Sequence, residues 1–454
     1  MKSALDDVLS WLCRLDAQLP PKVELKARWL LMDTLGCVMA GRLAPPVQQL
    51  ETVLGKSDPG SFRLLDGPGL SNSGAAWMLG MAACWDEACE GHAGAHGRPG
   101  VAALAALLPL SSQLTMGQFL RAFVVGYEVG ARAGASLRIK PGMHVDGNWP
   151  ALGAAAAVAH ALGLNAAGIE QAVHIAACQL PLSLYLPIRS GDTARNTFLG
   201  HAAALGQSAA FAAASGICAP GTSIDEYARV GLNREGLEID RSHRFHILDA
   251  YFKPYAAVRH VHYGALAALQ LKPEVDLESI TAISLSVYEE ATVYCANRAP
   301  QTPLQAQFSL SFGVAAMLRW SRLDPTVYRD PKFQDPLMRR LEALVEVTVD
   351  RELTHAAQRS ATLTIASNGT TVQQQVSAVH GDAAMPFTQA ALIEKFVSYC
   401  AACALQPQAR ATANQILTLP RDEKFDTLWA GIASMRSPVA SMIFDQVRRN
   451  SGAT

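Results

Sequence analysis

Residues 271–287 read LKPEVDLESITAISLSV, and in this stretch the sequence changes from a helical to a strand-like pattern. Lys272 and Pro273 end an alanine-rich helical segment. From 280 to 287 apolar and polar residues then alternate with the period of two that half-buried strands have. Strand-like segments recur at 345–349, 361–366 and 372–376, with a helical segment at 308–320 between them. Asn368 and Gly369 are typical of a tight hairpin turn, so we expect a βαββ unit.

The sequence on both sides of this unit is helical. Apolar periodicity broken by glycine and proline predicts helices at 24–39, 99–110, 117–135, 150–162 and 167–177. Gly41 and Gly163 are stop signals for two of them. The pattern returns to helix from Thr388 onward. The sequence therefore predicts a mainly α protein, in which a large all-helical domain (1–268 and 388–454) carries an inserted, smaller α+β domain (269–387).

Composition and charge exclude several classes of function. Half of the 454 residues are apolar and 17% are charged, which is typical of a well-packed globular enzyme. The 38 basic and 39 acidic residues leave no electrostatic footprint for nucleic acid. The apolar stretches end well short of the roughly 20 residues that span a bilayer, so we expect no membrane segment.

The first residues and the cysteines bear on the compartment. Asp6, Asp7 and Arg14 interrupt the N-terminal segment, which lacks the pattern of a signal peptide, so we expect a cytoplasmic protein. The nine cysteines are scattered, and we assign them to the core. Cys400 and Cys403 form a lone CxxC, for which a redox or metal site is the alternative to a buried apolar pair.

The densest group of reactive side chains lies in WDEACEGHAGAHGRPG, residues 85–100. Its glycines favour a loop that approaches a ligand closely, and Pro99 opens a helix whose free amides suit a carboxylate. Acids and histidines beside that end can exchange protons with a substrate. Two alternatives stay open: a solvated surface loop, and a metal site built from the same Asp, Glu and His ligands.

Two further clusters precede helices. In PGMHVDGNWP, residues 141–150, His144 is a candidate acid or base; alternatively, Asn148 caps the helix and His144 binds a loop carbonyl. In FKPYAAVRHVH, residues 252–262, Lys253 and Arg259 are candidate carboxylate clamps, whereas the alternative is a solvated junction. Arg189 and Arg195 could likewise be carboxylate clamps or part of a solvated junction.

Taken together, these segments resemble the MmgE/PrpD family, which includes 2-methylcitrate dehydratase, cis-aconitate decarboxylase and iminodisuccinate epimerase. Asp86 and His96 have the ten-residue spacing of the family's acid-to-histidine motif. The resemblance covers most of the chain, and its other motifs follow in order: Met32-Asp33-Thr34-Leu35-Gly36, Gly126-Tyr127-Glu128, His144 before an alanine run, Lys253-Pro254-Tyr255, Gln307-Phe308-Ser309, Gly381-Asp382 and Lys395-Phe396.

The resemblance implies a helical domain with an α+β lid, commonly in a homodimer, with neither a metal nor an organic cofactor and with the site between the domains. It implies four catalytic residues, namely Asp86, His96, His144 and Lys253. As substrate-binding residues we assign Glu90, His92, Arg98, Arg195, Tyr255, Arg259 and His260.

Three departures from the family pattern fall in this site. Glu90 stands where many members have threonine, and an acid there would repel an anionic group beside it. Arg195 replaces a lysine, and it suits a carboxylate clamp better than an acid because arginine does not release its proton. Gly97 and Arg98 stand in place of a proline after the motif histidine, and Arg98 adds a cation that would balance Glu90.

The expected chemistry is removal of a proton next to a carboxylate of a small di- or tricarboxylate, with Asp86 or His96 as the base. Nearby cations would stabilise the enediolate, and His144 would assist a leaving hydroxyl group. We predict a lyase of the dehydratase or decarboxylase type. An epimerase of a substituted succinate, a non-catalytic carboxylate-binding protein and a metalloenzyme are the alternatives.

Overall fold

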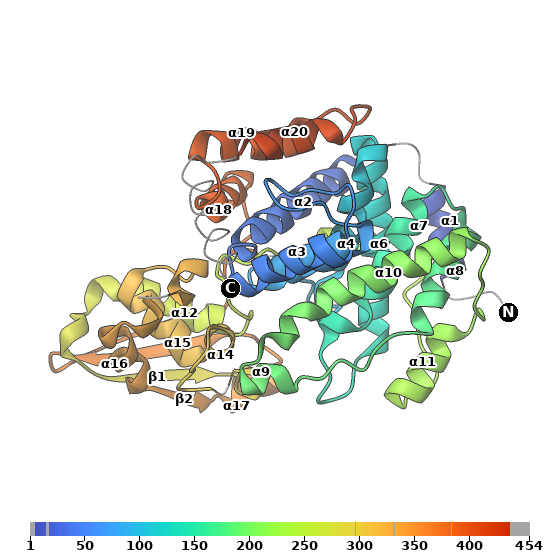
Figure 1. Ribbon diagram of the computed structural model, residues 1–454. Helices are drawn as coiled ribbons and strands as arrows, with labels where there is room; N and C mark the ends of the chain where they lie inside the picture. The colour runs from blue at the N-terminus through green and yellow to red at the C-terminus, as the bar shows by residue number, and fades with distance from the viewer. Residues whose placement is uncertain (1–4, 15–17, 296, 330–331, 383, 436–454) are drawn as a thin grey trace.

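The computed structural model describes residues 5–14, 18–295, 297–329, 332–382 and 384–435, and its described part is mostly helical with one four-stranded mixed sheet (Figure 1). The helices before the sheet are α1 Asp6–Cys13, α2 Pro21–Gly41, α3 Pro45–Ser57, α4 Asn72–Cys84, α5 Pro99–Leu107, α6 Met116–Leu137, α7 Pro150–Ala161, α8 Ala166–Ala177, α9 Leu186–Ser190, α10 Phe198–Ala214, α11 Ser223–Leu232 and α12 Val261–Leu271. All five predicted helices are therefore confirmed, with ends shifted by a few residues.

The helical core is built around α7, which packs against α5, α6, α8 and α10. Its alanine-rich sequence is buried from Pro150 to Ala159 because small side chains let several helices approach it at once. At the contact with α6, a β-carbon on Gly126 would lie 2.6 Å from the carbonyl oxygen of Gly153. This close packing fixes the loops at the start of α5 and α7.

The sheet has the strand order β2-β1-β3-β4, with strands at Ile280–Val287 (β1), Val345–Val349 (β2), Ala361–Ser367 (β3) and Thr370–Val376 (β4). β1 pairs in parallel with β2 and antiparallel with β3. Asn368 and Gly369 both have positive φ and close the β3–β4 hairpin, as the sequence predicts. All four predicted strands are thus confirmed, so the unit has one strand more than the name βαββ states.

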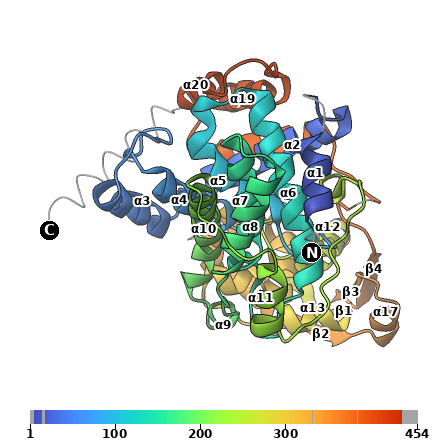
Figure 2. The same cartoon turned by 90° about the vertical axis from the view of Figure 1, so that its right-hand side faces the viewer.

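Helices pack on this sheet and connect its strands. Between β1 and β2 the chain forms α13 Glu289–Tyr294, α14 Pro303–Gln307, α15 Leu310–Trp320 and α16 Pro336–Leu344, and α17 Arg351–His355 follows β2. α12 contacts β3 and β4, and α15 contacts β2. Figure 2 shows the four strands gathered at one end of the molecule, with α17 at the outer edge.

The chain then returns to the first helices. α18 Gln389–Cys400, α19 Gln406–Thr418 and α20 Asp426–Ser434 follow the sheet, and α18 and α19 pack against α2. Figure 1 shows these last helices beside α2 and away from the sheet. The packing of α18 is close, since a β-carbon on Gly36 would lie 3.2 Å from the Phe396 ring. The domain boundaries at 268/269 and 387/388 stay predictions.

Two smaller expectations can be compared with the structure. None of the helices in the described part of the chain is long and apolar enough to cross a membrane. Cys400 and Cys403 are buried and free, as are four other cysteines. The assignment of all cysteines to the core is wrong for three of them, because Cys13, Cys178 and Cys218 are exposed on helix ends and loops.

Candidate active site

A cavity of about 320 Å³ lies where the loop between α4 and α5 meets the loops that precede α7 and α12. Glu290 and Tyr294 of α13 and Arg359, just before β3, line its other side. Eight of the predicted site residues line it: Glu90, His92, His96, Arg98, His144, Lys253, Arg259 and His260. The sequence clusters at 85–100, 141–150 and 252–262 therefore converge on one cavity.

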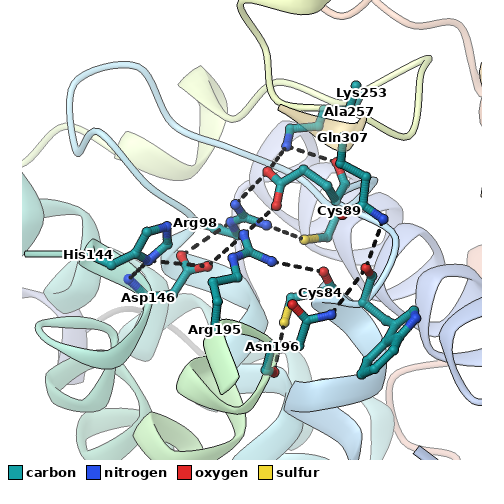
Figure 3. A network of polar contacts seen from close by, with 12 residues as sticks. Cys84, Cys89, Arg98, His144, Asp146, Arg195, Asn196, Lys253, Ala257 and Gln307 are labelled. Atoms are coloured by element: carbon teal, nitrogen blue, oxygen red, sulfur yellow. Dashed lines mark hydrogen bonds and ion pairs between the residues drawn. The ribbon is translucent and has the colours of Figure 1, made fainter. Parts of the chain in front are cut away.

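Glu87 is the centre of the charged network on the cavity floor. Figure 3 shows the three cations of this network, Arg98, Arg195 and Lys253, gathered in one place. The Glu87 carboxylate accepts hydrogen bonds from Arg98 at 2.6 Å and Lys253 at 2.7 Å, and it also pairs with Arg195. The side chain is fully buried. Burial alone would raise the pKa of Glu87, but the three cations hold it well below its ordinary value. Glu87 therefore stays ionised and is a weak base.

Asp146 is the second carboxylate of this network. Its two oxygens lie 3.3 Å from Nε of Arg98 and 3.2 Å from Arg195. Burial opposes ionisation here too, yet the two arginines lower the pKa of Asp146. Two carboxylates thus face three cations, Arg98, Arg195 and Lys253, which leaves one positive charge in excess. An anion entering the cavity meets a floor that favours it.

His144 is held in one tautomer by the same segment. Its Nδ1 accepts a hydrogen bond from the backbone N–H of Asp146 at 3.1 Å, so in the neutral ring the proton sits on Nε2. Burial lowers the pKa of His144 to about 4, which keeps the ring neutral near pH 7. His144 therefore presents an Nε2–H donor.

The ammonium group of Lys253 is deeply buried, and its charge is paired with that of Glu87. Its ammonium group donates to both the carboxylate and the backbone oxygen of Glu87, at 2.7 and 3.0 Å. Burial lowers the pKa of Lys253 from its ordinary value, and Glu87 opposes that shift. An ammonium group has three donors, so one N–H of Lys253 remains for a ligand in the cavity it lines.

His96 is the histidine of the lining with the fewest constraints. Its ring has no hydrogen-bond partner within the described ranges, and the residue is exposed where it lines the cavity. Burial, with smaller effects of Arg138 and Arg359, lowers its pKa, so the ring is neutral with a free lone pair. Its backbone has φ of 55°, a left-handed conformation that is uncommon for a residue other than glycine and clusters at functional sites.

Glu90 occupies the N-terminus of α5. Its carboxyl group accepts a hydrogen bond from Gly100 N–H at 2.8 Å, so the amide that the sequence assigned to a substrate carboxylate already has a partner within the chain. Burial raises the pKa of Glu90 to about 8. The side chain is therefore mostly protonated at neutral pH, which removes the repulsion that an ionised acid at this position would cause.

Gly97 explains a second departure from the family pattern. A β-carbon at this position would lie 2.6 Å from the Trp149 ring, which packs over the loop from the start of α7. The next residue, Arg98, directs its guanidinium group to the floor of the cavity. The sequence predicted that Arg98 balances Glu90, but its hydrogen bond and ion pairs to carboxylates are with Glu87 and Asp146.

The wall toward α12 carries Arg259 and His260. Arg259 pairs with Asp382 and lies over the Tyr251 ring at 4.9 Å, so its charge is already compensated. His260 bonds the hydroxyl group of Tyr288 through Nδ1 at 2.5 Å and stacks on Tyr294. Burial lowers its pKa to about 3, and the ring is neutral.

The side of the cavity away from the floor carries charges that the sequence did not single out. Arg359, just before β3, lies 3.2 Å from Glu290 of α13, and both side chains are partly exposed. Arg138 follows α6, is exposed, and has no acidic partner among the residues that the structure describes. These outer cations flank the part of the cavity that contains His96, since both lower its pKa.

Three predicted site residues do not line the cavity. The carboxylate of Asp86 lies 3.9 Å from Arg329, on the other side of the loop. The reason is local: Glu87 has φ of 54°, and the chain reverses there. Tyr255 packs its ring against His262 at 5.2 Å. Arg195 is fully buried beneath Glu87, where it supports the floor.

His92 lines the cavity, but both of its ring nitrogens already have partners. Nδ1 accepts from Ala95 N–H at 3.0 Å, and Nε2 faces the carbonyl oxygen of His246 at 3.2 Å. Together with His246 and Asp249 it forms a group close enough to hold a metal ion. A metal there would have to displace these bonds, so the donor set fits loop closure better.

Glu87 and Asp146 are the acids of the cavity floor that the sequence prediction missed. Both stand inside clusters that the sequence picked out, yet neither has the spacing of the motif. A signal existed in the charges: a buried floor with Arg98, Arg195 and Lys253 requires acids, and these were the unassigned acids nearby.

Comparisons with known proteins address the family directly. Residues 10–231 match the model of the MmgE/PrpD N-terminal domain, and residues 255–419 match that of the MmgE/PrpD C-terminal domain. A search of curated proteins gave no match. The two family models cover most of the chain in the order that the motifs predict, and the chain belongs to the MmgE/PrpD family.

Proposed function

We propose that this protein is a cofactor-independent lyase that removes a proton next to a carboxylate of a small di- or tricarboxylate. Membership of the MmgE/PrpD family supports chemistry of the dehydratase or lyase type. The observation that carries the proposal is the cavity floor, on which three cations face two carboxylates beside neutral histidines. Such a floor attracts an anion and stabilises the charge that develops on its carboxylate.

His96 is the base in this proposal. Its ring is neutral, has a free lone pair and lines the cavity, whereas Asp86 faces Arg329. The other three histidines of the lining, His92, His144 and His260, have bonded Nδ1 atoms. A base with a pKa near or below neutrality is deprotonated and ready at physiological pH. The proton passes from the substrate carbon to the ring nitrogen of His96.

The electrons then move into the substrate. Breaking the C–H bond leaves its electron pair in an enediolate, whose oxygens Lys253 and Arg98 stabilise. In a dehydration this pair forms the carbon–carbon double bond, and the neighbouring C–O bond breaks. The leaving hydroxide takes a proton and departs as water, with the Nε2–H of His144 or Lys253 as the donor.

Residues of the inserted unit complete the proposed site. Arg359, Glu290 and Tyr294 belong to 269–387, and they line the same cavity as Lys253 and His96. We therefore propose that 269–387 acts as a lid over a helical domain formed by 1–268 and 388–454. Arg359 and Arg138 would bind the carboxylate that lies farther from the reacting carbon.

Epimerisation of a substituted succinate is the second candidate. It requires two proton-exchanging groups, and the cavity offers two in different surroundings: His96 near Arg138 and Arg359, and Lys253 beside Glu87. In that reaction one group would remove the proton and the other would return it to the opposite face of the carbon.

Incubation in deuterated water tests the proposal. The protein is mixed with citrate-like and succinate-like acids, and NMR follows both deuterium uptake and products. We expect uptake at a carbon next to a carboxylate, with loss of water or carbon dioxide for a lyase and inversion for an epimerase. Binding of an acid without exchange or products would contradict both and favour a carboxylate-binding protein.

Elemental analysis and chelation test the cofactor-free prediction, and light scattering tests the homodimer.

A further inference from the structure

A buried ion pair lies directly behind the loop that forms the cavity floor. Nζ of Lys395, on α18, is 2.5 Å from Oδ1 of Asp33, on α2. The same ammonium group donates to the backbone oxygen of Ala88 at 2.8 Å. The Asp33 side chain is fully buried and that of Lys395 is 8% exposed, so water does not screen these contacts.

These contacts reach the residues on both sides of Ala88. The preceding residue is Glu87, the centre of the cavity floor. Two residues later, the backbone N–H of Glu90 acts on the Asp33 carboxylate, and the Asp33 charge in turn raises the pKa of Glu90. Within the described ranges, Lys395 is the side chain that donates a hydrogen bond to Asp33. The pair thus acts on the loop through Ala88 and Glu90.

Glu87 needs such support because its backbone is strained. Its φ of 54° lies in the left-handed region, which a glutamate adopts only when its surroundings hold it there. Lys253 binds the carbonyl oxygen of Glu87 at 3.0 Å from the cavity side. Lys395, which does not line the cavity, binds the next carbonyl oxygen, that of Ala88. Two buried ammonium groups therefore fix two consecutive carbonyls at the reversal.

We propose that Lys395 is a positioning residue, which holds the Ala88 carbonyl so that Glu87 faces the cavity and Asp86 faces away from it. The inference rests on the proposed function in so far as the cavity floor is the reacting site. It means that α18, which follows the sheet in the sequence, sets the geometry of a loop that precedes α5. Asp33 orients Lys395 and compensates its charge.

Three variants separate positioning from stability. Lys395→Met leaves Asp33 buried and unpaired, so we expect a lower melting temperature. The double variant Asp33→Leu/Lys395→Met replaces the pair with apolar side chains, so we expect most of the melting temperature to return. Glu394→Gln/Arg410→Met removes an exposed ion pair between α18 and α19 and is the matched control.

The readouts are hydrogen–deuterium exchange of peptides covering 85–98, and kcat and KM for the acid that wild type converts. In Lys395→Met and in the double variant we expect amide exchange in this loop to rise at least tenfold and kcat to fall by a similar factor. The control should match wild type in both. The result that supports positioning is a double variant whose melting temperature has recovered, while amide exchange in 85–98 is still fast and kcat is still low.

Two outcomes would overturn the proposal. One is recovery of loop protection and kcat together with the melting temperature in the double variant, since the pair would then serve stability alone. The other is unchanged loop exchange in a folded Lys395→Met. If wild type converts no acid at all, the proposed function fails, while the exchange data still decide the role of Lys395.

Discussion

Asp86 and Glu87 are neighbours in the chain, but their carboxylates face opposite sides of one loop. Glu87 contacts Arg98, Arg195 and Lys253 on the cavity floor, whereas Asp86 lies 3.9 Å from Arg329 outside the cavity. Both are buried, and their pKa values differ in direction: the cations lower that of Glu87, and burial raises that of Asp86 to about 6. We therefore expect the replacement of Glu87 and the replacement of Asp86 to have different effects.

Replacing each acid with its amide measures this difference. Glu87→Gln leaves three cations facing Asp146 alone, so we expect a loss of about 3–5 kcal/mol in unfolding free energy. Asp86→Asn removes a carboxylate that burial disfavours, and we expect little change in stability at pH 7 and retained proton exchange. Urea unfolding and deuterium uptake are the measurements. Equal losses for the two variants would mean that the loop directs both side chains to one site.

His96→Asn tests the base. Asparagine tolerates the left-handed backbone at this position, so the loop should keep its conformation. We expect deuterium uptake to fall at least about 100-fold, the usual contribution of a general base, with an unchanged melting temperature. His243→Asn is the control, because His243 is exposed and stacks on Trp11. Uptake at the wild-type rate in His96→Asn would assign the base elsewhere.

Glu90 predicts a pH dependence of stability. Its folded pKa of about 8 lies above the ordinary 4.5, so folding favours the protonated form. The contribution of Glu90 to folding stability is therefore fully present below pH 4.5, and it is lost as the pH rises through about 8. Between pH 6.5 and 8 Asp86, with a pKa of about 6, is already ionised.

We therefore expect the melting temperature of wild type to fall between pH 6.5 and 8, and that of Glu90→Gln to fall less. Glutamine keeps an oxygen for Gly100 N–H but does not titrate. Calorimetry at several pH values measures both slopes. Parallel slopes would show that Glu90 is ionised in the folded protein.

Replacement of Arg359 tests how many carboxylates the cavity binds. We expect Arg359→Gln to weaken binding of succinate by about tenfold, the usual value of a charge-assisted hydrogen bond, and to leave the weak binding of propionate unchanged. Added salt should reduce the difference because Arg359 is partly exposed. NMR titration measures both acids, and Arg229→Gln on α11 is the control. An equal loss for both acids would place Arg359 at the common carboxylate.

The helices and the hairpin could be predicted because their signals are local. The period of the apolar residues, the stop at Gly163 and the Asn368-Gly369 turn each depend on a few neighbouring residues. The three loops of the cavity could also be found, since glycine and proline frame their polar residues.

The direction of each side chain could not be predicted in the same way. Whether Asp86 or Glu87 enters the cavity depends on one left-handed residue, and that conformation is held by contacts with Lys253 and Lys395, which are distant in the sequence. The motif spacing selected Asp86, while the charges of Arg98, Arg195 and Lys253 select Glu87. Likewise, the state of Glu90 depends on burial between α5 and α2, which no local pattern contains.

The contact between Gly97 and Trp149 has a consequence for recognising related sequences. The indole ring leaves no room for a β-carbon at 97, so any other residue there requires a smaller side chain at 149. We therefore predict that the two positions change together among homologues. A glycine at the first combined with tryptophan at the second would mark the genomes whose homologues share this cavity shape.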